Sequence, residues 1–437
     1  MSILTFKGGI HPYEGKELSK TGEVKRLLPE GDVVIPLSQH IGAPAKACIA
    51  VGDRVLVGQK IGEAVGFISA NVHSSVSGTV KKIEPHLVAA GNMVECVVIE
   101  NDDLYEEYSW DLKEYEDMTK EEKISAIKEA GVVGMGGAGF PTNVKLSPKS
   151  PEEIDYVIIN GAECEPYLTS DYRRMIDNPE ILIEGLKMIL SLFDNAKGII
   201  AVEDNKLDAI IKLKKLVKKE DDIDIKAVYT KYPQGGERAL IYAVTGRQVN
   251  SSMLPADVGC VVNNVDTVFA IHNALRNHKP LTSRIVTVSG DAIEKPGNFL
   301  VPFGTNIRQV IEAAGGFKVQ PEKIINGGPM MGIAVFSIDY PVTKGTSALL
   351  AFKKDEVSAN EPSVCINCGK CLTVCPGRVM PSRLADYAEN GDVESFLANY
   401  GMECCECGCC SYICPAKRNL THSIKSMRKD ILASRKK

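Results

Sequence analysis

The sequence predicts an α/β protein built from several domains, and three observations support this fold class. Short β-rich segments separated by glycines fill residues 33–100, strand-like and helix-like apolar segments alternate over residues 156–229, and cysteines concentrate near the C-terminus. These patterns are of different kinds and predict different architectures. At roughly 150 residues per domain, a chain of 437 residues has room for about three domains or a few more small ones.

Composition and charge exclude several classes of protein. Hydrophobic residues make up 44% and charged residues 24% of the chain, as in ordinary globular proteins, and the formal net charge of −5 argues against nucleic-acid binding. The most apolar helical stretch, residues 181–193, is interrupted by Glu184 and Lys187 and falls short of the ~20 apolar residues that cross a bilayer. Residues 1–12 lack the pattern of a signal peptide. We expect a protein of the reducing cytoplasm that meets a membrane only through partners.

Residues 1–104 are predicted to form an N-terminal β domain. Its segments VGDRVLVGQKIGEAVG, VHSSVSGTVKKI and NMVECVVIE read as short strands of a small sandwich or barrel. They resemble the barrel-sandwich domains that carry biotin or lipoate on a lysine at a hairpin tip. No lysine occurs between Lys60 and Lys81, so we expect a structural or docking module rather than a swinging arm.

A glycine-rich loop follows a predicted helix. Thr119 and Glu122 form a capping-box pattern that opens this helix, which runs into Gly134-Met-Gly-Gly-Ala-Gly-Phe-Pro141. The loop satisfies GxGxxG, but the dinucleotide fingerprint needs a strand before it and a helix after it. Here a helix precedes and Phe140-Pro141 follows. The loop still allows backbone amides to approach a phosphate or a flat ring closely.

Strands and helices then alternate. We predict strands over 156–160, 198–202 and 223–229, with helices over 179–193 and 207–218 between them. This alternation is typical of a largely parallel sheet covered by helices.

Three polar loops belong to this region: Asn160-Gly-Ala-Glu-Cys-Glu-Pro166, Tyr232-Pro-Gln-Gly-Gly-Glu-Arg238 and Asn263-Asn-Val-Asp-Thr267. Open α/β sheets bind their ligands at the carboxyl ends of strands. The third loop precedes an apolar helical stretch, whose first amides could meet an anionic group. Simple turn chemistry explains any one of these loops, but three together predict a ligand site.

The glycine loop, Lys145 and the three polar loops resemble, in order and approximate spacing, the flavin and nicotinamide site of the NADH-oxidising flavoprotein subunit of respiratory complex I. The resemblance implies a Rossmann-like FMN- and NADH-binding domain over residues 118–280. It places the glycine loop along both nucleotides, Lys145 on the flavin phosphate, and three asparagines on the isoalloxazine or phosphate. Ala162 and Gly236 depart from the family, which has aspartate and glutamate there. The implied cofactor-binding residues are Gly134, Gly136, Gly137, Ala138, Gly139, Phe140, Lys145, Asn160, Glu163, Glu165, Tyr232, Gly235, Glu237, Asn263 and Asn264.

Residues 281–345 are predicted to form a third domain. A strand begins at Arg284, a helix covers residues 307–314, and the loop GGPMMG follows. The segment resembles the β-grasp (SLBB) module that follows the flavin domain in the same family. We assign it no chemistry, and its expected role is to position the flavin domain against the C-terminal domain.

Eight cysteines of the C-terminal domain, predicted over residues 355–437, form two runs with one spacing. The runs are Cys365-x-x-Cys368-x-x-Cys371-x-x-x-Cys375-Pro and Cys404-x-x-Cys407-x-x-Cys410-x-x-x-Cys414-Pro. Zinc favours paired CxxC knuckles and disulfides suit secreted domains, so two [4Fe–4S] clusters in a helical ferredoxin-like domain fit better.

In two-cluster ferredoxins the last cysteine of each run binds the other cluster. The first ligand set is therefore Cys365, Cys368, Cys371 and Cys414, and the second is Cys404, Cys407, Cys410 and Cys375. Cys405 and Cys409 lie out of register, and we interpret them as non-ligands; the alternative is that one of them replaces a ligand of the second run.

Two N-terminal segments extend the resemblance to most of the chain. Gly8-Gly-Ile-His-Pro12 and Ile35-Pro-Leu-Ser-Gln-His-Ile-Gly42, together with the ferredoxin-type end, resemble the RnfC family, one of the components of the Rnf complexes. That family belongs to membrane-bound ferredoxin:NAD oxidoreductases that couple electron transfer to sodium-ion or proton translocation. The cobalamin reductases of microcompartments share the flavin loop and the cysteine runs but lack the first segment.

This resemblance implies a peripheral enzyme subunit on the cytoplasmic face of the membrane. NADH or NAD would exchange hydride with non-covalent FMN, and single electrons would pass through the two clusters to or from other Rnf subunits, membrane-embedded and ferredoxin-like. Because FMN does the hydride chemistry, no side chain is expected to be catalytic. A flavin-free, cluster-carrying adaptor is the alternative from a different class.

Overall fold

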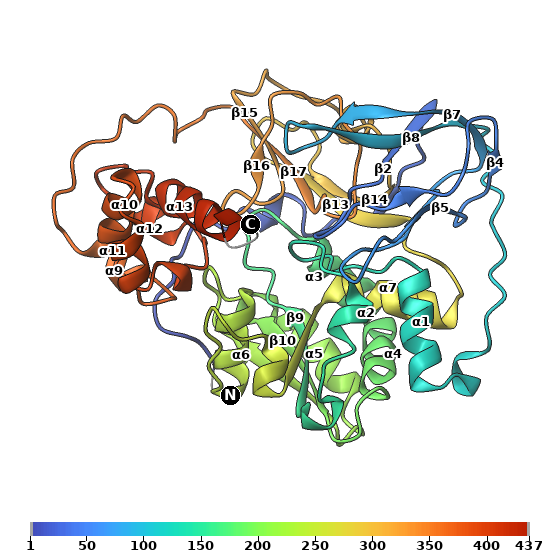
Figure 1. Ribbon diagram of the computed structural model, residues 1–437, viewed down its shortest axis with the longest axis horizontal. Helices are drawn as coiled ribbons and strands as arrows, with labels where there is room; N and C mark the ends of the chain where they lie inside the picture. The colour runs from blue at the N-terminus through green and yellow to red at the C-terminus, as the bar shows by residue number, and fades with distance from the viewer. Residues whose placement is uncertain (1–2, 435–437) are drawn as a thin grey trace.

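The computed structural model describes residues 3–434, so residues 1–2 and 435–437 of the predicted terminal domains lie outside it. Two β modules lie above a central α/β domain in Figure 1, and a helical domain with the C-terminal cysteines lies to one side. The extended segment 353–369 connects that helical domain to the β module beside it.

The N-terminal β domain consists of two small sheets. One has the order β2-β8-β7-β4 and the other β3-β5-β6, with all neighbours antiparallel. Val33, Ile35, Ile61, Val97 and Ile99 are fully buried between them. The predicted barrel-sandwich architecture is therefore present. Its strands are β2 (Asp32–Pro36), β3 (Lys46–Ala47), β4 (Arg54–Val55), β5 (Lys60–Glu63), β6 (Val72–His73), β7 (Gly78–Leu87) and β8 (Met93–Asn101).

Residues 3–26 follow a different course. Leu4 forms a parallel bridge with Val228 and Ile10 an antiparallel bridge with Tyr232, both in the α/β domain. Strand β1 (Lys25–Arg26) then pairs with the sheet of the third domain. The segment 3–26 thus ties three parts of the molecule together, and in Figure 1 it runs between the helical domain and the α/β domain.

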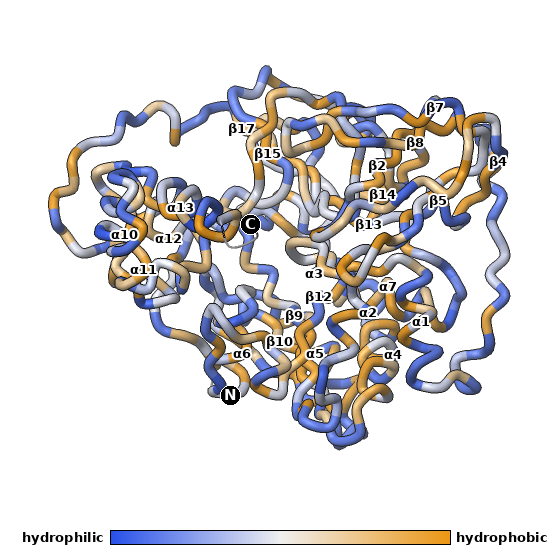
Figure 2. The backbone as a smooth tube through the Cα atoms, in the orientation of Figure 1, coloured by the Kyte–Doolittle hydropathy of each residue, from blue (hydrophilic) through white to orange (hydrophobic). Residues whose placement is uncertain are grey.

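The α/β domain has a parallel four-stranded sheet of order β11-β10-β9-β12. Its strand residues alternate between two cores, so Ile159 packs with α4 and α7 while Ile158 packs with α6. Burial on both faces explains the apolar runs of the central strands β9 and β10, visible in Figure 2, whereas the edge strand β11 includes the exposed Asp224. The elements are α1 (Lys120–Glu129), α2 (Thr142–Lys145), β9 (Tyr156–Gly161), α3 (Ser170–Asp177), α4 (Pro179–Leu190), β10 (Lys197–Glu203), α5 (Leu207–Leu216), β11 (Ile223–Val228), α6 (Glu237–Thr245), β12 (Cys260–Asn264) and α7 (Val265–Arg276).

The third domain has a six-stranded mixed sheet of order β1-β14-β13-β17-β15-β16. Its apolar residues, among them Val286 and Phe299, continue the larger core of the α/β domain without a break. Strand β17 (Ala348–Phe352), inside this sheet, reaches residue 352 and so extends beyond the domain boundary predicted at residue 345. The elements are β13 (Ser283–Ser289), β14 (Gly297–Pro302), α8 (Ile307–Ala313), β15 (Lys323–Asn326), β16 (Ile333–Ala334) and β17 (Ala348–Phe352).

The C-terminal domain is helical and has its own small core, which includes Leu384, Phe396 and Ile424. Helix α9, inside the first cysteine run, packs against α12, inside the second, and α10 packs against α13. The helices are α9 (Lys370–Val374), α10 (Pro381–Glu389), α11 (Val393–Ala398), α12 (Cys409–Ile413) and α13 (Leu420–Ser434).

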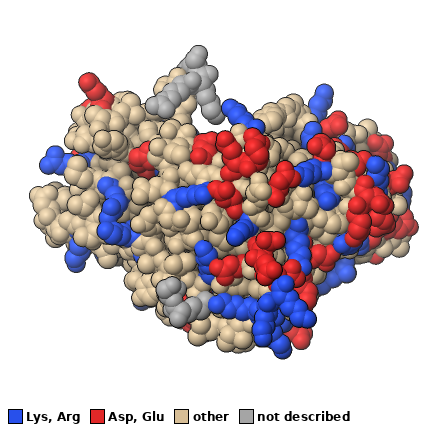
Figure 3. Space-filling view, turned by 90° about the horizontal axis from the view of Figure 1, so that it is seen from below, with Lys and Arg blue, Asp and Glu red and all other residues tan. Residues whose placement is uncertain are grey.

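The face seen in Figure 3 carries both basic and acidic side chains, with a group of Lys and Arg at its lower edge and groups of Asp and Glu above it and at the right. Within residues 3–434, no helix combines the length and the apolar content needed to span a bilayer.

Candidate nucleotide and cluster sites

The polar loops predicted from the sequence meet at one edge of the parallel sheet. Asn160 ends β9, and its side-chain amide donates to the carbonyl of Gly235, in the loop after β11, at 2.8 Å. Asn264 ends β12 and caps helix α7 by accepting a hydrogen bond from the amide of Asp266 at 2.8 Å. Parallel strands deliver their carboxyl ends to the same edge, so loops far apart in sequence form one surface here.

The glycine loop closes over this edge. Val133 bridges Pro141, and the amide of Gly134 donates to the carbonyl of Phe140 at 2.8 Å, so the two ends of the loop are joined. The apex, residues 136–138, is exposed. A Cβ on Gly136 would lie 2.9 Å from the side chain of Asn264, so a side chain there would collide with the sheet edge. Helix α1 precedes the loop and short helix α2 follows it.

Lys145, at the end of α2, points at the same edge. Its Nζ donates to the carbonyl of Val262 at 2.9 Å and forms an ion pair with Glu237 at 3.4 Å. Glu237 begins helix α6, whose N-terminal end carries a partial positive charge. Lys145 therefore places a positive charge between β12 and α6, where an anionic group of a ligand would be stabilised.

Three buried polar atoms at the edge have no hydrogen-bond partner among the described residues: Nδ2 of Asn263, Oγ1 of Thr142 and Nε2 of Gln234. Buried polar atoms are nearly always paired in folded proteins, so unpaired ones at the end of a parallel sheet indicate a missing polar ligand. FMN suits this donor set, because its phosphate and ring carbonyls accept hydrogen bonds and its flat ring suits a glycine-lined surface.

A carboxylate that the sequence analysis missed lies below the edge. Asp171 accepts a hydrogen bond from the Asn264 side-chain amide at 2.6 Å, and its own backbone amide donates to Glu163 at 2.9 Å. Burial, together with the nearby carboxylates of Glu163 and Asp266, raises the pKa of Asp171 to about 8. No sequence signal pointed to it, because the helix α3 that carries Asp171 was itself not predicted.

Glu165 turns away from the nucleotide edge. Its carboxylate accepts hydrogen bonds from the amides of Met330 and Met331, at 3.1 and 2.8 Å, in the GGPMMG loop of the third domain. A Cβ on Gly328 would lie 2.1 Å from the Glu165 carboxylate. Glu165 therefore joins the flavin-type domain to the β-grasp domain. Burial raises its pKa from 4.5 to about 7, although the two amide donors oppose this shift.

The raised pKa of Glu165 predicts a pH-dependent stability. Between about pH 4.5 and 7 the folded chain keeps a proton that the unfolded chain has released, so stability falls as pH rises through this window and levels off above it. Glu165→Gln does not titrate. The stability of this variant relative to the unmodified chain should therefore increase from pH 5 to pH 8, by about 3 kcal/mol at most. Thermal melting across this range measures the difference, and the exposed Glu361→Gln should show no such trend.

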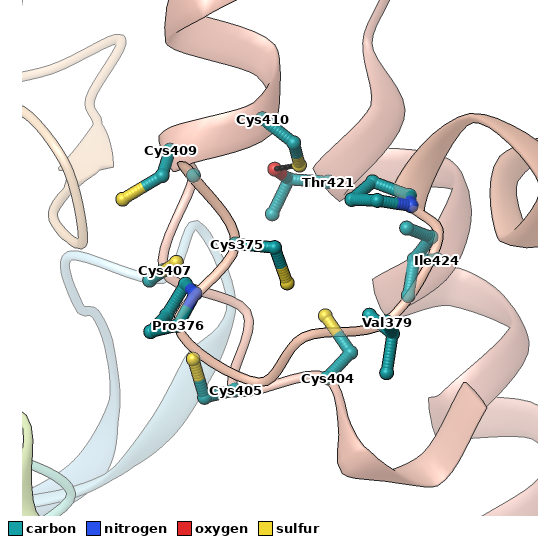
Figure 4. Close-up of a pocket in the computed structure, with 12 residues that line it drawn as sticks. Cys375, Pro376, Val379, Cys404, Cys405, Cys407, Cys409, Cys410, Thr421 and Ile424 are labelled. Carbon is teal, nitrogen blue, oxygen red and sulfur yellow. Dashed lines mark hydrogen bonds between the residues drawn. The ribbon is translucent and has the colours of Figure 1, made fainter. Parts of the chain in front are cut away.

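The second cysteine set lines one cavity of the helical domain. Cys375, Cys404, Cys407 and Cys410 surround it together with Thr421 and Ile424, and the out-of-register Cys405 and Cys409 also line it. Figure 4 shows the thiols of Cys375, Cys404 and Cys410 directed inward, while the Cys409 thiol points away. Cys375 comes from the first run and the others from the second. Soft thiolates spread around one cavity suit a multi-iron cluster.

The first set lies nearer the surface. Cys365 and Cys368 are exposed, and Cys371 and Cys414 are half-buried. The amide of Ser363 donates to the carbonyl of Ala416 at 2.9 Å, which holds the start of the first run beside the end of the second.

The second run also meets the α/β domain. The buried Cys409 thiol lies 3.8 Å from the carbonyl of Tyr232, and Glu403 accepts hydrogen bonds from the amide of Ser251 and, at 3.1 Å, from Arg238. The amide of Gly9, in the N-terminal segment, donates to the carbonyl of Val374 at 2.8 Å. Three separate contacts thus fix the paired runs against the domain that carries the nucleotide edge.

Two relatives match most of the chain. It is 45% identical over 439 residues to the C subunit of the Na⁺-translocating ferredoxin:NAD⁺ oxidoreductase complex of Acetobacterium woodii, covering 99% of this chain and 98% of that protein. The chain belongs to the RnfC family. It is also 41% identical over 385 residues to the C subunit of the proton-translocating ferredoxin:NAD⁺ oxidoreductase complex of Clostridium ljungdahlii, covering 88% of this chain and 84% of that protein.

Family models divide this RnfC chain in agreement with the predicted fold. Residues 4–104 match the RnfC barrel sandwich hybrid domain, residues 127–273 the Nuo51 FMN-binding domain and residues 285–334 the SLBB domain. The two relatives favour the RnfC family over the cobalamin reductase alternative. The predicted fold class is confirmed.

Solved structures show the same fold at low identity. The chain resembles NAD⁺-reducing [NiFe]-hydrogenase in its H2-reduced state with a TM-score of 0.50 and 19% identity, covering 73% of this chain and 62% of that one. The air-oxidized state gives a TM-score of 0.51, also at 19% identity, covering 72% of this chain and 61% of that one. The RnfC chain therefore spans less than two thirds of the hydrogenase chain, and the likeness concerns the fold alone.

Proposed function

We propose that this chain is the nicotinamide-linked electron-transfer subunit of a membrane-bound, ion-translocating ferredoxin:NAD oxidoreductase. NADH or NAD would be the substrate, FMN and two [4Fe–4S] clusters the cofactors, and the other Rnf subunits the partners. The observation that carries the proposal is the convergence of the glycine loop, Lys145 and three polar loops at one sheet edge, in a domain that also contacts the second cysteine run. Bound FMN would exchange hydride with the nicotinamide and single electrons with the clusters.

The residues implied by the sequence, apart from Glu165, which joins the β-grasp domain, are proposed to bind and orient the flavin. Lys145 would neutralise its phosphate, and Asn160, Asn263 and Asn264 would donate hydrogen bonds to the phosphate or the ring. The glycine loop would cover the ring, since its exposed apex has no side chain larger than a methyl group between Gly136 and Gly139. Glu163 and Asp171 would hold Asn264 in place from below.

The two cysteine sets are proposed to stand in a fixed order along the electron path. We name Cys375, Cys404, Cys407 and Cys410 the inner set, because their run packs against Tyr232 and the N-terminal segment. We name Cys365, Cys368, Cys371 and Cys414 the outer set, because two of its thiols are exposed. The inner set would exchange electrons with the flavin domain, and the outer set with another subunit.

The domain boundaries 1–104, 118–280 and 355–437 are retained as part of this proposal, as is a place on the cytoplasmic face of the membrane, while the third domain, predicted over 281–345, is extended to the end of β17 at residue 352. The names of the relatives support the membrane partner, since both are subunits of ion-translocating complexes. Binding to the membrane would then occur through the other subunits.

FMN binding tests the proposal. The full chain, reconstituted anaerobically with iron and sulfide, should quench the fluorescence of added FMN with one site per chain. Lys145→Met should weaken FMN binding by roughly 10- to 100-fold, because it removes a charge-assisted bond to the phosphate. The exposed Lys149→Met, four residues further along, should bind FMN normally. A chain that carries both clusters but binds no FMN would be the flavin-free adaptor instead.

A further inference from the structure

Two buried cations of the β-grasp domain hold the glycine loop from behind. Arg284, on β13, donates to the carbonyl of Met135 at 3.2 Å and to the carbonyl of Lys344. Lys344 donates from Nζ to the carbonyls of Gly131 and Asn71, both at 2.7 Å. Gly131 and Met135 lie just before and inside the loop, and Asn71 belongs to the barrel-sandwich domain. Three domains therefore meet at these two side chains.

Among the described residues, neither Arg284 nor Lys344 forms an ion pair of the kind that ordinarily accompanies a buried charge. Arg284 is 2% and Lys344 1% exposed, and within residues 3–434 their side-chain hydrogen bonds all end on backbone carbonyls. Burial lowers the pKa of Lys344 to about 7. Burial also lowers the pKa of Arg284, while the more distant carboxylates of Asp266 and Asp171 favour its charged form. Burying cations without a directly paired carboxylate is costly, so stability alone does not account for them.

The backbone is shaped to receive these cations. Gly131 has a φ of +65°, and a Cβ there would lie 2.4 Å from the carbonyl oxygen of Asn71 and 3.1 Å from Lys344 Nζ. Any side chain at residue 131 would displace both groups. On the other side of Met135, its amide donates to Thr267 Oγ1 of helix α7 at 2.9 Å. Met135 is thus fixed at both its amide and its carbonyl.

Fixing the Met135 carbonyl also fixes the next amide. The carbonyl of Met135 and the N–H of Gly136 belong to one planar trans peptide, so they point in opposite directions. Because Arg284 holds the carbonyl toward the β-grasp domain, the N–H of the exposed Gly136 is directed away from that domain. A cation on the carbonyl also polarises the peptide and strengthens the N–H as a donor.

We propose that Arg284 is a positioning residue for the flavin nucleotide: it aims the Gly136 N–H at the bound ligand, with Lys344 anchoring the base of the loop to the two neighbouring domains. This inference rests on the proposed FMN site. Under this proposal the β-grasp domain contributes to nucleotide binding, in addition to positioning the flavin domain against the C-terminal domain.

The test compares FMN binding by Arg284→Met, Arg284→Lys and the unmodified full chain, all reconstituted with iron and sulfide. Arg284→Met should raise the dissociation constant for FMN roughly 10-fold or more, since a charge-assisted contact is lost. Arg284→Lys should recover part of the affinity, because one ammonium reaches one carbonyl but not both. The visible circular dichroism of bound FMN should change in Arg284→Met, which a loss of stability alone would not cause. Arg308→Met, in the same domain and paired with Asp339 at 2.7 Å, is the control and should bind FMN normally.

The possible results distinguish a failure of the proposed FMN site from a failure of the positioning role of Arg284. If the unmodified chain binds no FMN, the proposed function fails. If it binds FMN and Arg284→Met binds equally well, with unchanged circular dichroism, the positioning role is wrong. If Arg284→Met does not fold, Thr267→Val decides, because it frees the Met135 amide without burying or removing a charge: reduced FMN affinity supports the inference, and unchanged affinity overturns it.

Discussion

Replacing Cys375 with alanine is expected to remove the cluster of the second cysteine run and to leave that of the first. Cys375 is the last cysteine of the first run, yet its thiol points into the cavity lined by Cys404, Cys407 and Cys410. Without it the inner set has three thiolates instead of four. Iron per chain should fall by about half, and electron paramagnetic resonance of the dithionite-reduced protein should lose one of two cluster signals.

Two control variants accompany this change. Cys409→Ala should keep both clusters, because the Cys409 thiol points out of the cavity toward Tyr232. Cys414→Ala should lose the other cluster signal, that of the outer set. If Cys375→Ala lost the outer signal and kept the inner one, the exchange of fourth ligands between the runs would be contradicted.

The second large effect concerns the order of the two clusters. In Cys414→Ala, NADH should still reduce the remaining inner cluster, because the contacts of the inner run with Tyr232 and with the N-terminal segment are unchanged. In Cys375→Ala, NADH should reduce the remaining outer cluster much more slowly than it reduces the inner cluster in Cys414→Ala, because the inner cluster that would pass electrons from the flavin is absent. Electron paramagnetic resonance spectra of samples frozen at short times after mixing with NADH measure both rates. Equal rates in the two variants would contradict the proposed order.

The pattern of apolar and polar residues along the chain was sufficient to predict the strands and loops that form the site. Strands β9 and β10 are apolar runs because they are buried on both faces, and the loops that follow β9, β11 and β12 are polar. Helix α3 was not predicted, since most of residues 170–177 are polar and the helix depends on the packing of Tyr172 and Met175 into the core. Tertiary packing overrides weak propensity in such a segment.

The partners of individual side chains were less accessible to sequence reasoning. The hydrogen bonds of Glu165 join residues about 165 positions apart, and those of Arg284 to Met135 join residues 149 apart. No local spacing encodes such contacts. The cysteine runs are the opposite case, because an iron–sulfur cluster requires a fixed short spacing, and that spacing is visible in the sequence.

Ala162 and Gly236, where the complex I flavoprotein family has aspartate and glutamate, lie in two loops that touch each other. A Cβ on Gly235 would lie 2.2 Å from the carbonyl oxygen of Ala162, so the loops after β9 and β11 touch at the backbone. Gly236 is the residue before helix α6, where its carbonyl accepts from the amide of Leu240 at 2.8 Å. The two loops remain joined here by backbone contacts and by Asn160.

The most direct test of the electron path is the reduction of the clusters by NADH with and without FMN. The full chain is reconstituted anaerobically with both clusters, divided, and one part is loaded with FMN. NADH should bleach the visible iron–sulfur absorbance of the FMN-loaded part and leave the flavin-free part unchanged, while dithionite bleaches both. Bleaching of the flavin-free part by NADH, or no bleaching of the loaded part, would contradict a path from nicotinamide through flavin to the inner cysteine set.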